Sequence, residues 1–367
     1  MLFEEFGQGI NLGGYLSQYE LIADAQNKEA LRKHFDTFIT GEDIRQIADW
    51  GFDHVRIPVD GYLFYDREKK ALKKEPMDYL DRCVAWCREH GVNVVIDLHN
   101  ITGHVFGQME EPSPLMVKED LRNDFVRFWE EMTVHFREFG GIRLMFELFN
   151  EIADATGYQW NRLHKRTVKK IHEIDPARWV LVGSNYVNSV GYLDRLDLME
   201  DPNVFYNFHY YEPNVFTHQM AHFSQEFCEY KKELGYPGDM TEYMEFLKTH
   251  EKFAKDHPMM TEETIRNDRA LMEKFMLHAK RFVEYTGCEL YCGEFGVIDC
   301  APEGEAVKWL RDFITICNGM RIGHAMWNYK CLDFELLDER GSVVRPGILA
   351  FLREQNRIWK EESRKAE

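Results

Sequence analysis

The sequence lacks the cysteine and histidine spacings that mark protein metal sites. Its eight cysteines form no CxxC pair, and Cys83/Cys87 and Cys288/Cys292 lie four residues apart with no second half of zinc-site spacing. No HxH or HExxH run is present. We therefore expect free, mostly packed thiols, no metal, and a reducing compartment such as the cytoplasm.

Positive charge and long apolar runs are also scarce. The chain has 63 acidic residues against 45 lysines and arginines, a formal net charge of -18, which repels phosphate backbones and anionic membranes. No run approaches the roughly 18 apolar residues that a bilayer crossing needs. The opening MLFEEFGQGINLGG lacks both a secretory signal and the glycine spacing of nucleotide sites. We therefore expect a cytoplasmic monomer (secreted if a leader was removed) with no nucleic-acid partner, no membrane partner and no cofactor.

What the sequence does have is a regular alternation of short, apolar, β-rich stretches with helical patterns. Runs such as NVVID and RLMFELF have few polar breaks, which is typical of parallel strands covered on both faces. Thr40, with Asp43 three residues on, opens one helical segment that Gly51 closes. Eight strands alternating with helices predict an α/β fold, a (β/α)8 TIM barrel, as a single domain over residues 1–367. The expected strands are 7–13, 52–59, 92–100, 142–151, 179–185, 204–211, 290–297 and 323–329.

One connection between expected strands is much longer than the others. His209 and Glu294, at the ends of strands six and seven, are 85 residues apart. Residues 213–270 between them are rich in charge and aromatics and contain no Ser/Gly-rich linker. We predict an inserted helical subdomain between strand six and helix six. It is either a surface excursion that packs on itself or a lid, because loops after barrel strands surround the mouth of the barrel.

Polar side chains gather at the carboxyl ends of the expected strands, which all face one mouth in this architecture. So many ionisable groups at one face are costly to desolvate unless they serve one another or a ligand. Two of them are carboxylates, Glu151 at the end of strand four and Glu294 on strand seven. The strand ends supply Asn11, Arg56, His99, Asn150, Glu151, His209, Tyr211, Glu294 and Trp327.

Two glutamates that face each other across a cleft are the machinery of glycoside hydrolysis. One must stay neutral to protonate the leaving oxygen, while the other must be ionised to attack the anomeric carbon. A nearby arginine would keep the second charged, and burial without a cation would raise the pKa of the first. A tryptophan at the mouth offers a flat apolar platform for the carbon-bearing face of a pyranose.

At these positions the sequence resembles glycoside hydrolase family 5, the retaining β-glycanases. The matching motifs fall in the family's order along the whole barrel: HVRIPVD, DLHN, LFNE, FHYYEP, GEFG and MWNY. GINLGGYLSQ, HFDTFIT, NFHYYEPNVFTHQ, LYCGEFGVI and WNYK resemble the endoglucanase C type of that family, which also carries a helical insertion after strand six. The chain departs from the family's pattern at Asn100, where a second histidine is common, and at Tyr15 and Phe223, where tryptophan is expected.

The resemblance implies a role for each matching residue. Glu151 corresponds to the acid/base and Glu294 to the nucleophile, with the two carboxyl groups about 5–5.5 Å apart. It also implies that Arg56 contacts the nucleophile and keeps it ionised, and that Asn150 binds the sugar 2-hydroxyl. His99, His209 and Tyr211 would line the subsite of the reacting sugar and Trp327 would floor it. Asn11, at the end of strand one, is placed with these substrate-binding residues.

The function that follows is a retaining endo-β-glucanase of the cellulase type. It would hydrolyse β-1,4 or mixed β-1,3/1,4 glucans by double displacement through a covalent glycosyl-enzyme. A mannanase, an exo-β-glucosidase or a transglycosylase would use the same machinery, and a carbohydrate-binding protein on an inactive barrel is the alternative of another class. Taken singly, Glu151 also fits a helix N-terminal acid, and His99 and His209 fit satisfied core histidines. Glu147, in the middle of LMFELFNEI, is expected to pair with Arg56 or another donor, because an unpaired buried carboxylate would be neutral.

Overall fold

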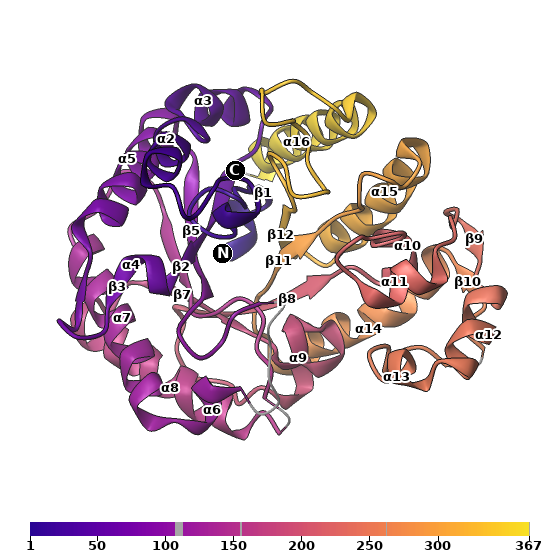
Figure 1. The fold of residues 1–367 in the computed structure, drawn as a ribbon, viewed down its shortest axis with the longest axis horizontal. Coiled ribbons are helices and arrows are strands. Elements are labelled where there is room, and N and C mark those ends of the chain that lie inside the picture. The colour runs from indigo at the N-terminus through magenta and orange to yellow at the C-terminus, as the bar shows by residue number, and fades with distance from the viewer. Residues whose placement is uncertain (107–112, 155, 262, 367) are drawn as a thin grey trace.

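In the computed structural model, eight parallel strands close into a barrel with helices around it (Figure 1). The strand order is β1-β12-β11-β8-β7-β6-β5-β2, so the first strand pairs with the last and closes the ring. This confirms the predicted (β/α)8 barrel, and every predicted strand is present. The strands are β1 (Gln8–Asn11), β2 (His54–Asp60), β5 (Asn93–Asn100), β6 (Leu144–Glu147), β7 (Trp179–Gly183), β8 (Val204–Tyr210), β11 (Leu290–Phe295) and β12 (Gly323–Met326).

The structure describes residues 1–106, 113–154, 156–261 and 263–366. Residues 107–112, 155, 262 and 367 fall within the predicted domain, and Glu262 within the predicted insertion, but they lie outside the described residues.

Two helices show caps that the sequence pattern indicated. At α3 (Gly41–Asp49), Thr40 and Asp43 form a capping box, in which each side chain accepts a hydrogen bond from the other's main-chain N–H. At α5 (Lys74–His90), Gly91 ends the helix with a φ of 66°, a left-handed conformation that glycine adopts at little cost. The rest of the outer ring consists of α2 (Lys28–Thr37), α7 (Glu119–Phe136), α8 (Tyr158–Ile174), α14 (Arg269–Thr286), α15 (Glu303–Gly319) and α16 (Pro346–Ala366).

Several short elements complete the connections on the two ends of the barrel. They are α1 (Leu2–Glu5), η1 (Tyr19–Leu21), α4 (Gly61–Phe64), β3 (Tyr65–Asp66), β4 (Ala71–Leu72), α6 (Pro114–Val117), α9 (Asn185–Asn188) and η2 (Val190–Arg195).

The barrel interior is apolar at its amino end and polar above. Leu2, the first residue of α1, and Phe6, which follows its last residue, fill the amino end, and both are fully buried. Nearer the carboxyl ends, the buried side chains Arg56 and Glu147 are charged. The functional side chains therefore lie above a barrel end that is closed by packed apolar side chains. The apolar plug comprises Leu2, Phe6, Val95, Met145, Leu181, Phe205, Tyr291 and Ala325.

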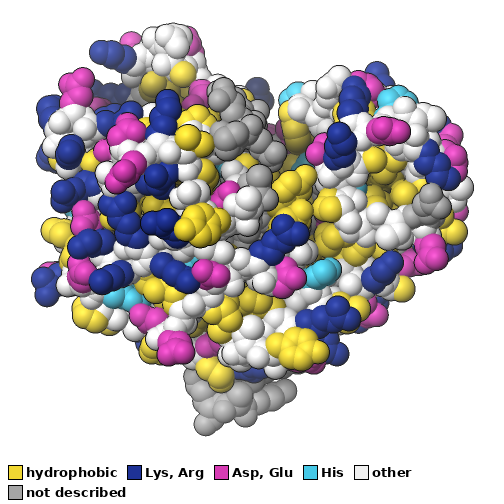
Figure 2. Space-filling model, turned by 90° about the horizontal axis from the view of Figure 1, so that it is seen from below, with side chains coloured by type: hydrophobic (Ala, Val, Ile, Leu, Met, Phe, Trp, Pro, Cys, Tyr) yellow, Lys and Arg dark blue, Asp and Glu magenta, His cyan; other side chains and the backbone are white. Residues whose placement is uncertain are grey.

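The segment between β8 and α14 is the predicted insertion after barrel strand six. It lies outside the ring, beside α14 and α15 (Figure 1). The molecule is notched between two lobes when it is seen from below, and the insertion belongs to the right-hand lobe (Figure 2). Movement of this segment as a lid stays a prediction. Its elements are α10 (Asn214–Thr217), α11 (Gln225–Tyr230), α12 (Thr241–Thr249), α13 (Glu251–Ala254) and an antiparallel pair, β9 (Gly238–Asp239) with β10 (Arg266–Asn267).

The expected free thiols are confirmed, because all eight cysteines are unpaired. Packing is less complete than predicted: Cys83, Cys87, Cys292 and Cys317 are buried, whereas Cys228 and Cys300 are exposed. In the described ranges, no helix combines the length and the hydropathy that a bilayer crossing requires.

Candidate active site

One arginine organises the floor of the barrel mouth. Arg56, on β2, is fully buried. Its guanidinium forms a two-point ion pair with Glu147 on β6, at 2.7 and 2.9 Å, and donates to Oε1 of Glu294 on β11 at 2.8 Å. A third carboxylate, Asp97 on β5, lies 3.0 Å from the same guanidinium. The prediction that Glu147 pairs with Arg56 is confirmed, and the predicted contact of Arg56 with Glu294 is present.

Two asparagines complete the surroundings of Arg56. Asn11 accepts a hydrogen bond from Arg56 at 2.9 Å, and its amide nitrogen donates to main-chain carbonyls of β11 and β12. Because Asn11 is 0% exposed and both ends of its amide are engaged, the prediction that Asn11 binds substrate is wrong. Arg56, also grouped with the substrate-binding residues, does not bind substrate either: its donors are used by Asn11, Asn150 and carboxylates, so it acts through Glu294, as the resemblance implies. Asn150 accepts from Arg56 at 2.8 Å, which leaves its NH2 end to donate elsewhere.

One buried cation does not neutralise three buried carboxylates, and the pKa values reflect this. Burial raises the pKa of Glu147 and of Asp97 to about 7, although the charge of Arg56 lowers both. Burial works to lower the pKa of Arg56, but Asp97 and Glu147 more than offset it and hold that pKa well above its ordinary value. Arg56 is therefore permanently charged beside Glu294.

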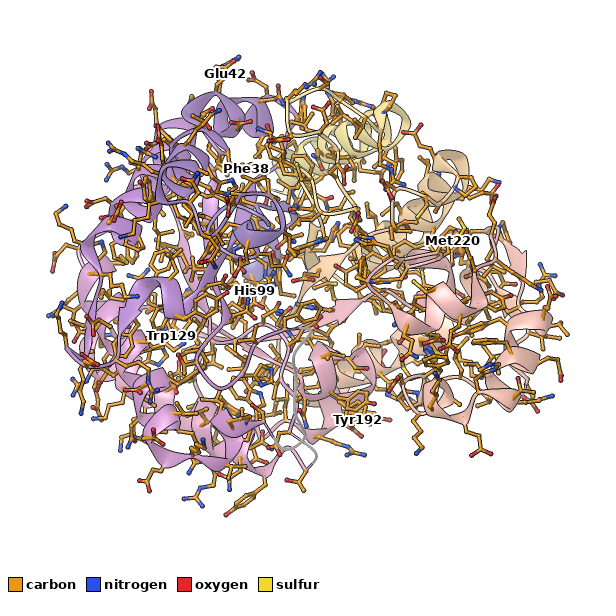
Figure 3. The ribbon with its side chains drawn as sticks, in the orientation of Figure 1. Phe38, Glu42, His99, Trp129, Tyr192 and Met220 are labelled. Carbon is orange, nitrogen blue, oxygen red and sulfur yellow. The ribbon has the colours of Figure 1, made fainter. Side chains whose placement is uncertain are left out.

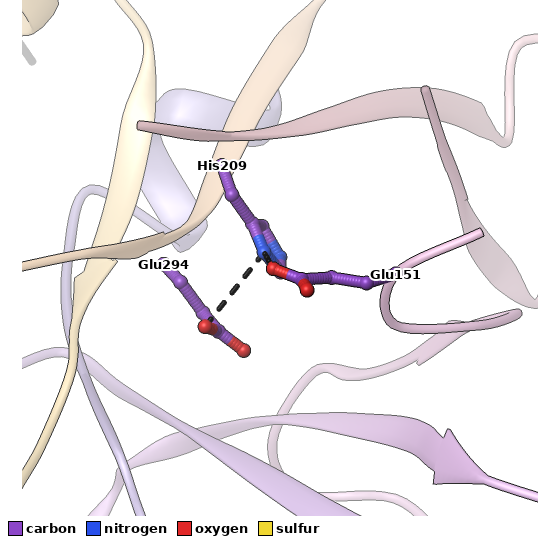
Figure 4. Close-up of side chains that lie close together, drawn as sticks. All are labelled: Glu151, His209 and Glu294. Atoms are coloured by element: carbon purple, nitrogen blue, oxygen red, sulfur yellow. Dashed lines mark hydrogen bonds and ion pairs between the residues drawn. The ribbon is translucent and has the colours of Figure 1, made fainter. Parts of the chain in front are cut away.

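The two predicted glutamates meet at the mouth, with His209 between them (Figure 4). Nδ1 of His209 lies 2.9 Å from Oε1 of Glu151 and 3.7 Å from Oε2 of Glu294. One carboxylate oxygen of each glutamate and a ring nitrogen of His209 all lie within 4.8 Å of one another. Retaining glycosidases hold their carboxyls about 5–5.5 Å apart, while inverting ones need about 6.5–9.5 Å to admit a water. The observed spacing is that of retention.

The chain delivers Glu151 to this position by a backbone that stays tied to both neighbouring strands. β6 ends at Glu147, short of the predicted 142–151. Beyond it, the N–H of Leu148 donates to β7 at 3.0 Å and the N–H of Asn150 donates to β5 at 3.0 Å. His104 then lies with its Nε2 2.7 Å from the carbonyl of Glu151. The main chain that carries Glu151 is therefore bonded to β7, to β5 and to the ring of His104.

The surroundings separate the pKa values of the two glutamates. Burial and the negative charge of Glu294 raise the pKa of Glu151 well above its ordinary value. Burial also raises the pKa of Glu294 above its ordinary value, but the charge of Arg56 and the hydroxyl of Tyr211, which donates to Oε2 at 3.0 Å, oppose that rise. When the pair shares one proton, that proton therefore belongs on Glu151.

His209 is held as a neutral donor toward Glu151. The amide nitrogen of Asn188 lies 3.2 Å from Nε2 of His209, so Nε2 accepts and Nδ1 carries the hydrogen. Burial lowers the pKa of His209 well below its ordinary value. Sequence reasoning missed Asn188 and His104, because Asn188 ends the short helix α9 and His104 lies in the loop after β5, both outside the recognised strand-end positions.

His99 and Trp327 form one wall of the mouth, and Figure 3 shows His99 near the centre of the barrel. Their rings are parallel, with centroids 5.8 Å apart and planes inclined by 11°. His99 also pairs with Asp97 at 2.8 Å, and burial lowers its pKa to about 4. Trp327 is 7% exposed. Both therefore stand where the sequence placed them, as neutral, flat surfaces.

Glu151, His209 and Glu294 could in principle offer three ligand atoms to a cation. The guanidinium of Arg56, 2.8 Å from Glu294, already supplies a fixed positive charge at that carboxylate. A second cation would meet its repulsion. Proton transfer and nucleophilic attack are the chemistry that this donor set favours.

Comparison with known proteins agrees with this geometry. The family model for cellulase (glycosyl hydrolase family 5) matches residues 23–331. Endoglucanase C of Acetivibrio thermocellus is 38% identical over 351 residues, which cover 95% of this chain and 98% of that protein. Cellodextrinase A of Ruminococcus flavefaciens is 32% identical over 307 residues, which cover 83% of this chain and 80% of that one.

A solved structure of Thermotoga maritima Cel5A with cellobiose superimposes with a TM-score of 0.73 at 22% identity, covering 96% of this chain and 100% of that one. At that identity the likeness shows the fold. The family match, the relatives and the paired carboxylates lead to one conclusion: the chain belongs to the cellulase family, glycosyl hydrolase family 5, and is a glycoside hydrolase.

Proposed function

We propose that this protein is a retaining endo-β-glucanase in which Glu151 is the acid/base and Glu294 the nucleophile. The observation that carries the proposal is the carboxylate spacing, within 4.8 Å, combined with unequal surroundings. Arg56 and Tyr211 both donate to Glu294, whereas Glu151 is buried beside that negative charge and has its pKa raised. One group therefore attacks and the other holds a proton.

The first half of the reaction breaks the glycosidic bond. Glu151 gives its proton to the glycosidic oxygen as Glu294 attacks the anomeric carbon, so that the leaving sugar departs as an alcohol and a covalent glycosyl-enzyme forms. In the second half, the ionised Glu151 takes a proton from water, and the resulting hydroxide displaces Glu294 with a second inversion. The anomeric configuration is retained, and both carboxyl groups return to their starting states.

The remaining polar groups bind the reacting sugar. The NH2 end of Asn150 is placed to donate to the 2-hydroxyl, an interaction that strengthens toward the transition state. His99 and Trp327 supply the flat surface for a pyranose ring. His209 orients Glu151 through its Nδ1–H.

The substrate class is proposed from the relatives. Endoglucanase C and Cellodextrinase A both have names that refer to β-glucan cleavage. We take β-1,4 or mixed β-1,3/1,4 glucan as the substrate and internal cleavage as the mode. Mannan cleavage, exo cleavage and transglycosylation use the same two carboxylates and are outcomes of the test.

The test is an activity panel on carboxymethylcellulose, barley β-glucan, laminarin, glucomannan and mannan with the wild type, Glu294→Ala and Glu151→Gln. We expect turnover on the best glucan to fall at least ~10²-fold in each variant. Turnover that survives in both variants would refute the site. Sizing of products from cello-oligosaccharides separates internal from terminal cleavage, and NMR of the first product gives its anomeric configuration.

We also propose that the protein acts as a monomer in a reducing compartment. The eight free thiols support the second point, because oxidising compartments favour disulfides. Size-exclusion chromatography with light scattering tests the first, and cell fractionation of the native source tests the second. A dimer, or activity confined to the medium, would contradict them.

A further inference from the structure

A histidine of the insertion packs against the catalytic centre. His218 follows α10 and lies between the insertion and Tyr211, whose hydroxyl donates to Glu294 at 3.0 Å. The ring of His218 meets that of Tyr211 edge to face, with centroids 4.9 Å apart and planes inclined by 74°. His218 is therefore packed directly against the side chain that contacts the proposed nucleophile.

A hydrogen-bond relay also joins His218 to the main chain of Tyr211. The hydroxyl of Thr217 donates to the carbonyl of Tyr211, and Nδ1 of His218 lies 3.0 Å from the same hydroxyl oxygen. A hydroxyl has one hydrogen, so its oxygen accepts from the Nδ1–H of His218. Burial lowers the pKa of His218 to about 4, which leaves a neutral ring in this tautomer. Tyr211 is thus held at its ring and at its carbonyl.

The far side of His218 packs against the insertion and against the loop after β12. The ring of Phe227, on α11, is 6.4 Å away at 29°, and that of the exposed Phe223 is 6.2 Å away at 86°. Phe334, after β12, lies 5.1 Å from His218 and 5.8 Å from Tyr211. The ring of His218 therefore connects Phe223 and Phe227 of the insertion to Tyr211.

From these contacts we propose that His218 is a positioning residue that sets the hydrogen bond of Tyr211 on Glu294 and so couples the insertion to the nucleophile. The inference rests on the proposed role of Glu294. A hydrogen bond to a carboxylate favours its ionised form. Loss of His218 should loosen Tyr211, weaken that bond and move the ionisation of Glu294 to higher pH.

Other groups around Glu294 do not provide a competing route. Besides Tyr211, the charged or titratable side chains near Glu294 are Arg56 on β2, Asp97 and His99 on β5, Glu151 after β6, His209 on β8, and Cys292 on β11. In the described part of the chain, His218 contacts none of these, and its pKa is lowered by burial alone. A shift caused by His218 must therefore pass through Tyr211.

The experiment measures kcat/KM against pH with 2,4-dinitrophenyl β-cellobioside, whose leaving group needs no proton, so that the acid limb reports Glu294. We expect His218→Ala to move this limb upward by about half a pH unit or more, about a threefold loss on the acid side. Thr217→Val, which removes the relay hydroxyl and keeps the shape, should move it the same way. Tyr211→Phe should shift it at least as far, and His218→Ala in that background should add no further shift.

His250→Ala is the matched control, because the ring of His250 packs on Phe246 within the same insertion, at 4.1 Å, away from Tyr211. Its acid limb should stay at the wild-type position. The proposal would be overturned if the acid limb stayed at the wild-type pH in both His218→Ala and Thr217→Val. It would also be overturned if His218→Ala shifted the acid limb in the Tyr211→Phe background by as much as it does in the wild type. If His218→Ala does not fold, Thr217→Val decides. Glu294→Ala, assayed in parallel, tells the two hypotheses apart: residual full turnover there refutes the proposed function itself.

Discussion

Gly13 lies directly against the ring of Trp327. A Cβ built on Gly13 would come within 2.6 Å of the ring's Cη2 and 2.8 Å of its Cζ2, closer than any ordinary carbon contact. Trp327, the proposed sugar platform, can therefore occupy its position only because residue 13 is a glycine and has no side chain.

Gly13→Ala should displace Trp327 and lower kcat/KM on cello-oligosaccharides by about 10- to 100-fold, because a displaced platform misaligns the reacting sugar. Steady-state kinetics and tryptophan fluorescence check this together. Gly140→Ala is the control, since a Cβ there meets nothing within 4 Å. Unchanged kinetics in Gly13→Ala would show that Trp327 does not floor the subsite.

Glu147→Gln should destabilise the fold through Arg56. The pair is fully buried on both sides, and the substitution replaces its two charged hydrogen bonds with those of a neutral amide. Asp97 and Glu294 still balance the charge of Arg56, so we expect a loss of about 1.5–3 kcal/mol in the free energy of unfolding, the usual contribution of a hydrogen bond to a charged group. Denaturant melts at pH 7.5 measure it. Asp78→Asn, which breaks the exposed pair with Lys74, should change the stability little. Equal effects of the two substitutions would contradict the special role of the buried pair.

The two glutamates should respond differently to the leaving group. Glu151→Ala should lose at least ~10²-fold in kcat/KM on cello-oligosaccharides but far less on 2,4-dinitrophenyl β-cellobioside, because a good leaving group departs without a proton. Glu294→Ala should lose both activities, since no group remains to form the covalent intermediate. If Glu294→Ala instead kept its activity on the dinitrophenyl substrate and Glu151→Ala lost both activities, Glu294 would be the acid/base and Glu151 the nucleophile.

The insertion should lose stability as pH rises through the pKa of His257. This side chain lies 2.9 Å from Glu226 and 2.9 Å from the hydroxyl of Tyr243. Burial works against its protonation, but the hydrogen bond and charge of Glu226 prevail and raise the pKa of His257 above its ordinary value. A raised folded-state pKa contributes stability at pH below the unfolded value, and this contribution is lost as pH passes the folded value.

The check compares the wild type with Glu226→Gln by calorimetry at pH 5.5 and at pH 8.5. The wild type should exceed the variant in melting temperature by more at pH 5.5 than at pH 8.5. Because both proteins contain the other titrating groups, the contributions of those groups cancel in the difference between the two melting temperatures. An equal or larger gap at pH 8.5 would show that His257 is not charged in the cluster.

The strand-end rule accounts for how much of the site could be predicted. Parallel strands in a barrel present their carboxyl ends to one face, so Glu151, Glu294, His99 and Trp327 could be placed together without coordinates. The pairing of Glu147 with Arg56 followed from the cost of a lone buried carboxylate. These predictions depended only on strand direction and on charge.

The predictions that were wrong or incomplete depended on depth and on loops. Asn11 is at a strand end, as expected, but its amide is turned into the barrel wall and is fully buried. His104 belongs to a loop and Asn188 to the four-residue helix α9, and neither is long enough to show a periodic pattern in the sequence. That Tyr211 reaches Glu294 is a matter of side-chain length and ring orientation, which a pattern of residue types does not specify.

Closure of the ring by β1 and β12, with Gln8 opposite His324, has a consequence for how the protein is made. The first barrel strand leaves the ribosome early, yet its partner emerges only near the end of synthesis. Until then β1 and β11 each carry an open edge of unpaired main-chain groups, which is where association with other nascent chains begins. A messenger RNA truncated before the codon for Gly323 would yield a polypeptide that keeps both of these unpaired strand edges permanently.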